Sequence, residues 1–257
     1  MAHVKDEDIP VLKITGLSKN YGGLQVLADI HVEIRTGELH ALIGSNGAGK
    51  TTLFDIVCGF IRPSRGSIKF MGREITSLPA FKYAHLGIGR TFQITTLFRT
   101  LTVLDNLRLS LEALPATRLP FMKSGAFSER NIEPVIELLK PWGLWETRNV
   151  PVAALPYGVQ RQLEIVMALI QKPRLLLLDE PTAGMGDEET RQITALVRRL
   201  HRDKNCTIVL IEHDMRVVFH LADRITVLDQ GMLLAEGDPQ QIAANDAVQA
   251  AYLGKTA

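Results

Sequence analysis

A glycine-rich run after a short apolar stretch has the clearest capacity for chemistry in this sequence. It fits the pattern G-x-x-x-x-G-K-[ST] between a predicted strand, 38–43, and a helix-compatible segment, which is the context in which this pattern binds phosphate. Glycines let backbone N–H groups fold around phosphate oxygens, and the following helix points its positive end at the same anion. The predicted phosphate-binding residues are Gly44, Ser45, Asn46, Gly47, Ala48, Gly49, Lys50, Thr51 and Thr52.

Two side chains of this loop and a second motif predict hydrolysis. Lys50 is expected to bridge the β- and γ-phosphates, and Thr51 to offer its hydroxyl to Mg²⁺. The apolar stretch 175–178 ends in two adjacent carboxylates, Asp179 and Glu180. Asp179 can complete the Mg²⁺ shell, normally through water, and Glu180 can polarise the attacking water. Together the two motifs predict an enzyme that uses ATP and Mg²⁺.

Composition limits the classes of protein to consider. The 257 residues are 46% hydrophobic and 22% charged, which is ordinary for a soluble globular chain. The net charge of +1 indicates no nucleic-acid partner. No apolar stretch approaches the roughly 18 residues of a membrane-spanning helix, and the acidic start lacks a signal-peptide core. Cys58 and Cys206 lie in apolar runs and are expected to be reduced core thiols.

Apolar strands and helical segments alternate along the chain, which favours a parallel sheet covered on both faces. The predicted fold class is α/β: a P-loop NTPase parallel-sheet core with an antiparallel β subdomain and an inserted helical subdomain. The single domain divides into a catalytic core, 1–92 and 155–257, and the helical insertion, 93–154. Predicted strands are 12–17, 26–34, 38–43, 67–70, 175–178, 207–211 and 224–229, and predicted helices are 53–60, 133–140, 163–171, 187–204 and 215–221.

These motifs together resemble the ATPase subunits of ATP-binding-cassette transporters, from about Leu12 to Lys255. The resemblance implies roles for three further residues. Tyr21 would stack on adenine. Gln93, in Thr-Phe-Gln, would contact Mg²⁺ and the water while sensing the membrane partner. His213, in Ile-Glu-His-Asp, would hold the γ-phosphate and align the water with Glu180.

The same resemblance implies that a second ATPase subunit, packed head to tail, caps the γ-phosphate with an L-S-G-G-Q loop. The matching segment here is L-P-Y-G-V, so Pro156, Tyr157 and Gly158 are the predicted contacts to nucleotide bound by the partner. Proline has neither hydroxyl nor N–H, so the serine contact is absent at Pro156. A degenerate, non-hydrolysing site is the alternative, against which stand the intact Lys50 and Glu180. The partner can be a second copy or a related ATPase.

Within this family, L-x-Y-G-x-Q-R-x-L-E-I resembles the branched-chain amino-acid uptake ATPases. The predicted function is to power uptake of branched-chain or related amino acids across the cytoplasmic membrane. The chain would lie peripherally on the cytoplasmic face of that inner membrane, bound to permease subunits. A solute-binding protein would deliver solute to these subunits and so be an indirect partner. Urea or short-chain amide import, and lipid or lipopolysaccharide export, are the alternatives. A cassette ATPase of translation or DNA repair is disfavoured, because those usually carry two cassettes or a long coiled coil.

Four apolar residues after Gln93 are predicted to lie partly at a surface. Some of Leu97, Phe98, Leu101 and Leu104 would line a groove that receives a short permease helix. An amphipathic face packed inside the helical subdomain is the alternative.

Overall fold

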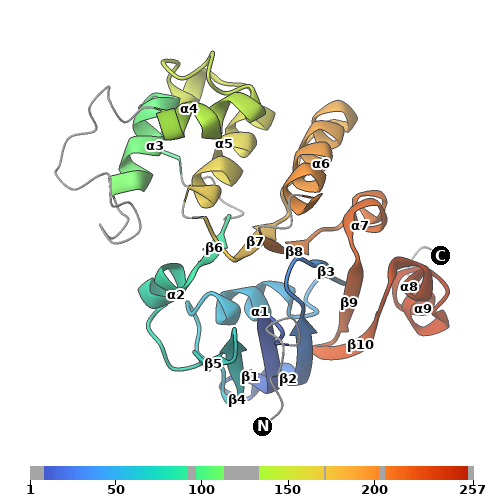
Figure 1. Cartoon of the computed structure of the whole chain (residues 1–257). Helices are drawn as coiled ribbons and strands as arrows, with labels where there is room; N and C mark the ends of the chain where they lie inside the picture. The colour runs from blue at the N-terminus through green and yellow to red at the C-terminus, as the bar shows by residue number, and fades with distance from the viewer. Residues whose placement is uncertain (1–8, 92–96, 113–132, 171, 203–205, 254–257) are drawn as a thin grey trace, which may run out of the picture.

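The computed structural model describes residues 9–91, 97–112, 133–170, 172–202 and 206–253. A six-stranded sheet lies at the centre of this part of the chain (Figure 1), in the order β10-β9-β3-β8-β7-β6. β9, β3, β8, β7 and β6 pair in parallel, and β10 pairs with β9 in the antiparallel sense. The strands are β3 (Leu39–Gly44), β6 (Ile88–Arg90), β7 (Leu175–Asp179), β8 (Thr207–Ile211), β9 (Arg224–Asp229) and β10 (Met232–Gly237).

A four-stranded antiparallel sheet, β2-β1-β4-β5, packs beside the first. Its strands are β1 (Leu12–Tyr21), β2 (Leu24–Ile34), β4 (Arg65–Phe70) and β5 (Arg73–Glu74). β1 and β2 run further than predicted, because they pair up to Tyr21 and Leu24 and the hairpin closes at Gly22–Gly23. Gly22 has a φ of +58°, a left-handed conformation that glycine adopts without steric cost.

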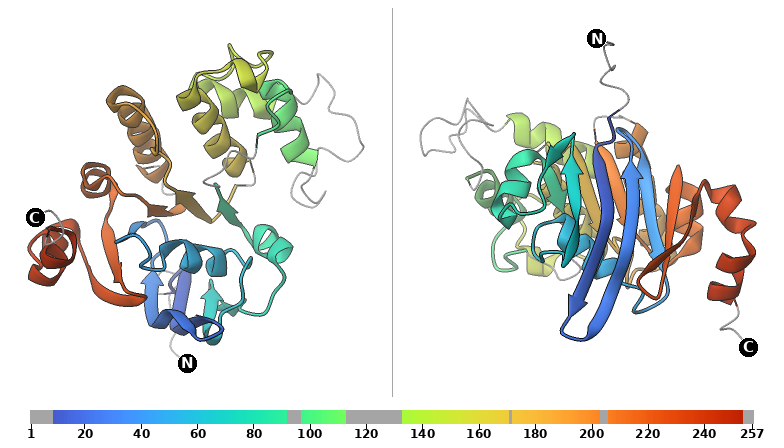
Figure 2. Two further views of the ribbon diagram at one scale, coloured as in Figure 1. Left: turned by 180° about the vertical axis from the view of Figure 1, so that it is seen from behind. Right: turned by 90° about the horizontal axis from the view of Figure 1, so that it is seen from below.

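Two hydrophobic clusters cover the two faces of the parallel sheet. The first lies between the two sheets around α1 (Lys50–Val57), with α2 (Ala80–Leu86) at its edge. The second packs α6 (Asp187–Arg202), α7 (Met215–Leu221), α8 (Pro239–Ala243) and α9 (Asp246–Leu253) against the other face. The two views of Figure 2 show the antiparallel sheet and the α6–α7 pair on opposite sides. This agrees with the parallel α/β core predicted from the sequence.

A third cluster holds the helical arm at the top of Figure 1. It contains α3 (Val103–Glu112), α4 (Glu133–Leu139), the short turns η4 (Lys140–Trp142) and η5 (Val152–Ala154), and part of α5 (Tyr157–Leu169). α5 connects the helical arm to the parallel sheet, since Leu163 and Val166 belong to the third cluster and Ile165 belongs to the second. The division into a core and a helical insertion therefore stays a proposal, with α5 as the element shared between them.

Several elements differ from their prediction for local reasons. α5 begins at Tyr157, six residues before the predicted start, with Pro156 at its N-cap. α1 begins at Lys50, within the phosphate-loop motif itself. The short elements α2, β5, β6, β10, α8 and α9 were not predicted. Residues 92–96 and 113–132, with Gln93 among them, lie outside the described residues.

Two predictions, that the cysteines are core thiols and that the apolar residues after Gln93 lie partly at a surface, are each confirmed only in part. Neither Cys58 nor Cys206 forms a disulfide, and burial raises the pKa of both thiols to about 12, but Cys206 is only partly buried. Leu97 and Leu104 belong to the third cluster and are core residues, whereas the Phe98 side chain is 55% exposed. In the part of the chain that the structure describes, no helix has the length and apolar character needed to cross a membrane.

Candidate active site

The predicted phosphate loop connects the end of β3 to the start of α1. Gly47 and Gly49 have φ values of +81° and +97°, so both positions favour glycine. A Cβ at Gly49 would lie 2.6 Å from Leu27 Cδ2, and one at Gly44 would collide with the Leu228 carbonyl oxygen. The loop is therefore held between β2 and β9. No side chain caps the Gly49 end of α1, which leaves the backbone N–H groups of this helix end for an anion.

Lys50 lies inside this loop and is 7% exposed. Its Nζ donates to the carbonyl oxygens of Gly44, at 2.7 Å, and Ser45, at 3.0 Å. Burial lowers the pKa of Lys50, and the negative charges of Glu180 and Asp179 oppose that shift. The Lys50 ammonium group thus lies at the loop, close enough to the predicted catalytic Glu180 and the predicted Mg²⁺ ligand Asp179 for their charges to act on its pKa.

Asp179 ends β7 and is 2% exposed. Burial raises the pKa of this carboxyl group, while the bonded Arg90 guanidinium acts in the opposite direction. Arg90 Nη2 lies 2.9 Å from Asp179 Oδ2, and Nη1 lies 2.5 Å from Asp55 Oδ1. Arg90 is a site residue that sequence reasoning missed. Arg90 ends β6, a strand that was not predicted, so its place three residues before Gln93 was the one available signal.

Glu180 and His213 follow β7 and β8 and meet across 33 positions of sequence. His213 Nε2 lies 2.7 Å from Glu180 Oε1. The Glu180 backbone has a φ of +46°, unusual for a residue with a side chain, and its N–H donates to the Ile211 carbonyl oxygen at 2.9 Å. The backbone conformation and the end of β8 together aim the carboxylate at the imidazole. The structure therefore brings this predicted catalytic pair together.

The remaining residues of the predicted nucleotide site lie in the phosphate loop and at the tip of the β1–β2 hairpin. Tyr21, at the tip of the β1–β2 hairpin, is 47% exposed, and Lys19 Nζ lies 4.8 Å from its ring centroid. Stacking of this half-exposed ring on adenine stays a prediction. Ser45 donates to Asp229 Oδ1 at 3.2 Å. Asn46, Gly47 and Thr51 are exposed, Thr52 is half-buried and Ala48 is buried.

Pro156, Tyr157 and Gly158 lie at the start of α5, on the arm away from α1 in Figures 1 and 2. Arg161 Nε donates to the Tyr157 hydroxyl at 3.2 Å. A Cβ at Gly158 would lie 3.0 Å from Glu189 Oε1 of α6. This segment contacts Arg161 of α5 and lies close to Glu189 of α6, and its contact to nucleotide bound by a partner stays a prediction.

Comparison with known proteins gives consistent matches over most of the chain. Residues 27–183 match the family described as ABC transporter, and residues 232–257 match the branched-chain amino acid ATP-binding cassette transporter family. LivG of Salmonella typhimurium, a high-affinity branched-chain amino acid transport ATP-binding protein, is 40% identical over 252 residues, which cover 96% of this chain and 98% of LivG.

Solved structures agree. The ADP conformation of MJ1267, an ATP-binding cassette of an ABC transporter, matches with a TM-score of 0.84 and 27% identity, over 96% of this chain and 99% of that one. MJ0796, another ATP-binding cassette, matches with a TM-score of 0.75 and 25% identity, over 89% of this chain and 98% of that one. Its structure is a dimer in a post-hydrolysis state with ADP and Pi.

The fold and the phosphate loop thus define a nucleotide-binding ATPase of the ABC transporter family, to which this chain belongs. Within that class, the chain belongs to the family of the branched-chain amino acid transport ATP-binding proteins.

Proposed function

We propose that this chain hydrolyses ATP to power an importer of branched-chain or related amino acids. It would work on the cytoplasmic face of the membrane, with permease subunits, a second ATPase subunit and, indirectly, a solute-binding protein. The similarity to LivG over 96% of the chain supports the choice of solute. The single observation that carries hydrolysis is the Glu180–His213 pair, 2.7 Å apart, beside the buried Lys50.

Each of these side chains has a task that its geometry allows. Lys50 exchanges its bonds to the Gly44 and Ser45 carbonyl oxygens for the β- and γ-phosphates of ATP. Glu180 accepts a hydrogen bond from the attacking water and orients it toward the γ-phosphate. His213 keeps the Glu180 carboxylate in place and contacts the same phosphate. Tyr21 stacks on adenine, and its exposed ring distinguishes bases little.

The residues at the phosphate loop fit a Mg²⁺ ion. Thr51 and Asp179 offer oxygen atoms, which Mg²⁺ prefers, and Gln93 is the further proposed ligand. Among the described residues, no group of three or more His, Cys, Asp or Glu side chains could hold a metal by itself. This suits an ion that takes most of its ligands from phosphate and water. When bound, Mg²⁺ neutralises the charge that develops on the phosphates.

The Pro156–Gly158 segment would complete the site of the partner subunit. The Gly158 N–H and the positive end of α5 can face a γ-phosphate, and α5 has no side-chain cap that would compete. The proline at 156 removes one donor from this set and leaves the helix end unchanged. Whether the partner is a second copy or a related ATPase does not alter this geometry.

Reconstitution with candidate permeases and binding proteins in vesicles tests the proposal. ATP-dependent uptake of labelled leucine is expected, with urea, a short-chain amide and lipopolysaccharide movement as comparison substrates. Glu180→Gln should stop uptake and hydrolysis while ATP still binds, because the phosphate loop is untouched. Uptake of urea but not leucine would refute the solute assignment. Near-normal hydrolysis by Glu180→Gln would refute the catalytic assignment.

A further inference from the structure

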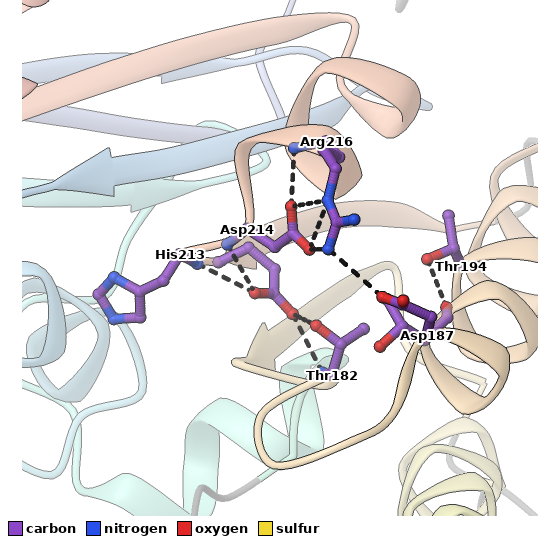
Figure 3. Close-up of polar contacts among 8 residues, drawn as sticks. Thr182, Asp187, Thr194, His213, Asp214 and Arg216 are labelled. Carbon is purple, nitrogen blue, oxygen red and sulfur yellow. Dashed lines mark hydrogen bonds and ion pairs between the residues drawn. The ribbon is translucent and has the colours of Figure 1, made fainter. Parts of the chain in front are cut away.

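A buried carboxylate beside the catalytic pair has no part in the site described above. Glu212 follows β8 directly, is 4% exposed, and accepts hydrogen bonds from two separate turns. Figure 3 labels its partners Thr182 and His213, and dashed lines mark these bonds. Its Oε1 accepts from the Thr182 N–H at 3.0 Å and from the Thr182 hydroxyl. Its Oε2 accepts from the N–H of His213 at 3.0 Å and of Asp214 at 3.5 Å. One side chain thus binds the backbone of both turns.

These two turns carry the proposed catalytic residues. Thr182 lies two positions after Glu180, in the turn between β7 and α6, and His213 lies in the turn between β8 and α7. The turns also meet through the Glu180 N–H bond to the Ile211 carbonyl oxygen and through the His213–Glu180 contact. Glu212 therefore adds a link that positions the His213 backbone relative to the strand end that bears Glu180.

A second link, an ion pair between the starts of α6 and α7, is weaker. Arg216 contacts Asp214 at 2.8 Å and Asp187, the first residue of α6, at 3.6 Å (Figure 3). The Arg216 and Asp187 side chains are more than three-quarters exposed, so water screens their attraction. The Glu212 bonds are shielded from water and involve a charged acceptor, which makes them the stronger link. Arg216 is consequently a matched control on the same surface.

We infer that Glu212 is a positioning residue for ATP hydrolysis, which locks the turns after β7 and β8 so that His213 and Glu180 face each other. The inference rests on the proposed function, because it needs Glu180 and His213 to be the residues that contact water and γ-phosphate. Glu212 itself touches neither. It acts through the backbone of His213, and it leaves the phosphate loop and therefore ATP affinity untouched.

Glu212→Gln breaks this link with little change in volume. A glutamine side chain has one oxygen and one NH₂ group, which is a donor only. If the oxygen faces Thr182, the NH₂ meets the N–H groups of His213 and Asp214. In the flipped orientation the NH₂ group faces the Thr182 N–H instead. At least one backbone N–H loses its acceptor either way, and that turn must shift.

The test uses the assembled transporter for kinetics and the full chain for spectroscopy. Glu212→Gln should lower kcat for ATP hydrolysis at least tenfold and leave KM for ATP and the calorimetric Kd within about twofold. The ring ¹⁵N resonances of His213, assigned with His213→Gln among the seven histidines, should shift in Glu212→Gln. Arg216→Gln should alter neither kcat nor these resonances. A purely structural role would change stability but not kcat per folded molecule.

A second variant addresses the link from its other end. Thr182→Val should lower kcat several-fold at unchanged KM, since it removes the hydroxyl bond, whereas Thr182→Ser should keep kcat near that of the wild type. Comparing Thr182→Val with Thr182→Ser still tests the positioning role if Glu212→Gln does not fold. Unchanged kcat in both Glu212→Gln and Thr182→Val, or unmoved His213 resonances, would overturn the inference. Glu180→Gln measured in parallel separates the hypotheses, since its full activity would instead overturn the proposed function.

Discussion

Replacing Arg90 with methionine tests how the buried Asp179 carboxylate is tolerated. Arg90 contacts Asp179 at 2.9 Å and Asp55 at 2.5 Å, and Asp179 is 2% exposed. Methionine fills similar space but leaves the buried Asp179 carboxylate without this ion-pair partner. Removing one partner of a buried ion pair typically costs about 3–5 kcal/mol of unfolding free energy. At roughly 2–4 °C per kcal/mol for a chain near this size, a loss of ~3 kcal/mol lowers Tm by roughly 6–12 °C.

The loss of unfolding free energy in Arg90→Met should grow as pH rises. Burial already raises the pKa of Asp179 above its ordinary value of 3.8, with Arg90 opposing, so the pKa rises further in Arg90→Met. Between the unfolded and the folded pKa, the folded state binds more protons than the unfolded state. The unfolding free energy of the variant therefore falls as pH rises through that range and levels off above the folded pKa. The loss should be smaller at pH 5 than at pH 8.

Urea unfolding of the full chain in EDTA, without nucleotide, measures this loss at both pH values. Arg90→Met should cost much less in an Asp179→Asn background, where no buried charge is left behind. The reasoning fails if the loss stays below about 1 kcal/mol. It also fails if the loss is the same at pH 5 and pH 8, or the same with and without the Asp179 carboxylate.

Four further predictions concern nucleotide binding, closure of the ATPase dimer and docking to the permease. Lys50→Ala should weaken ATP binding itself, because a charge facing the β- and γ-phosphates is lost, and an unchanged calorimetric Kd would contradict the phosphate-loop assignment. Pro156→Ser should change ATPase activity of the assembled transporter by no more than about tenfold, or roughly 1.4 kcal/mol of barrier, since it adds one bond to an already coordinated phosphate. Gly158→Leu should instead stop hydrolysis, because a side chain there would stand between the two subunits where backbone must approach phosphate; activity within twofold of wild type would contradict this. A photocrosslinker at the exposed Phe98 should capture a permease subunit, and a crosslinker at the buried Leu104 should not.

The sequence predicted the parts of this protein that depend on neighbouring residues. The residues of the phosphate loop are consecutive in the chain, and Gly47 and Gly49 adopt the left-handed backbone conformation that glycine favours. The strands 207–211 and 224–229 and the helix 215–221 have the predicted bounds, because the apolar pattern of each is readable locally. Short elements such as α2 and β5 were missed, since two to seven residues give too few periods for a pattern to stand out.

The tertiary structure decided which of these parts meet. Strand order places β7 between β6 and β8, and this order brings Arg90 to Asp179 across 89 positions. It also brings Glu180 to His213, and Glu212 to Thr182 across 30 positions. Sequence resemblance assigned Glu180 and His213 to one site, but neither Arg90 nor Glu212 carried a local signal of its partner. Pairing across a parallel sheet follows from the order of strands connected by crossovers, and residue spacing along the chain does not encode that order.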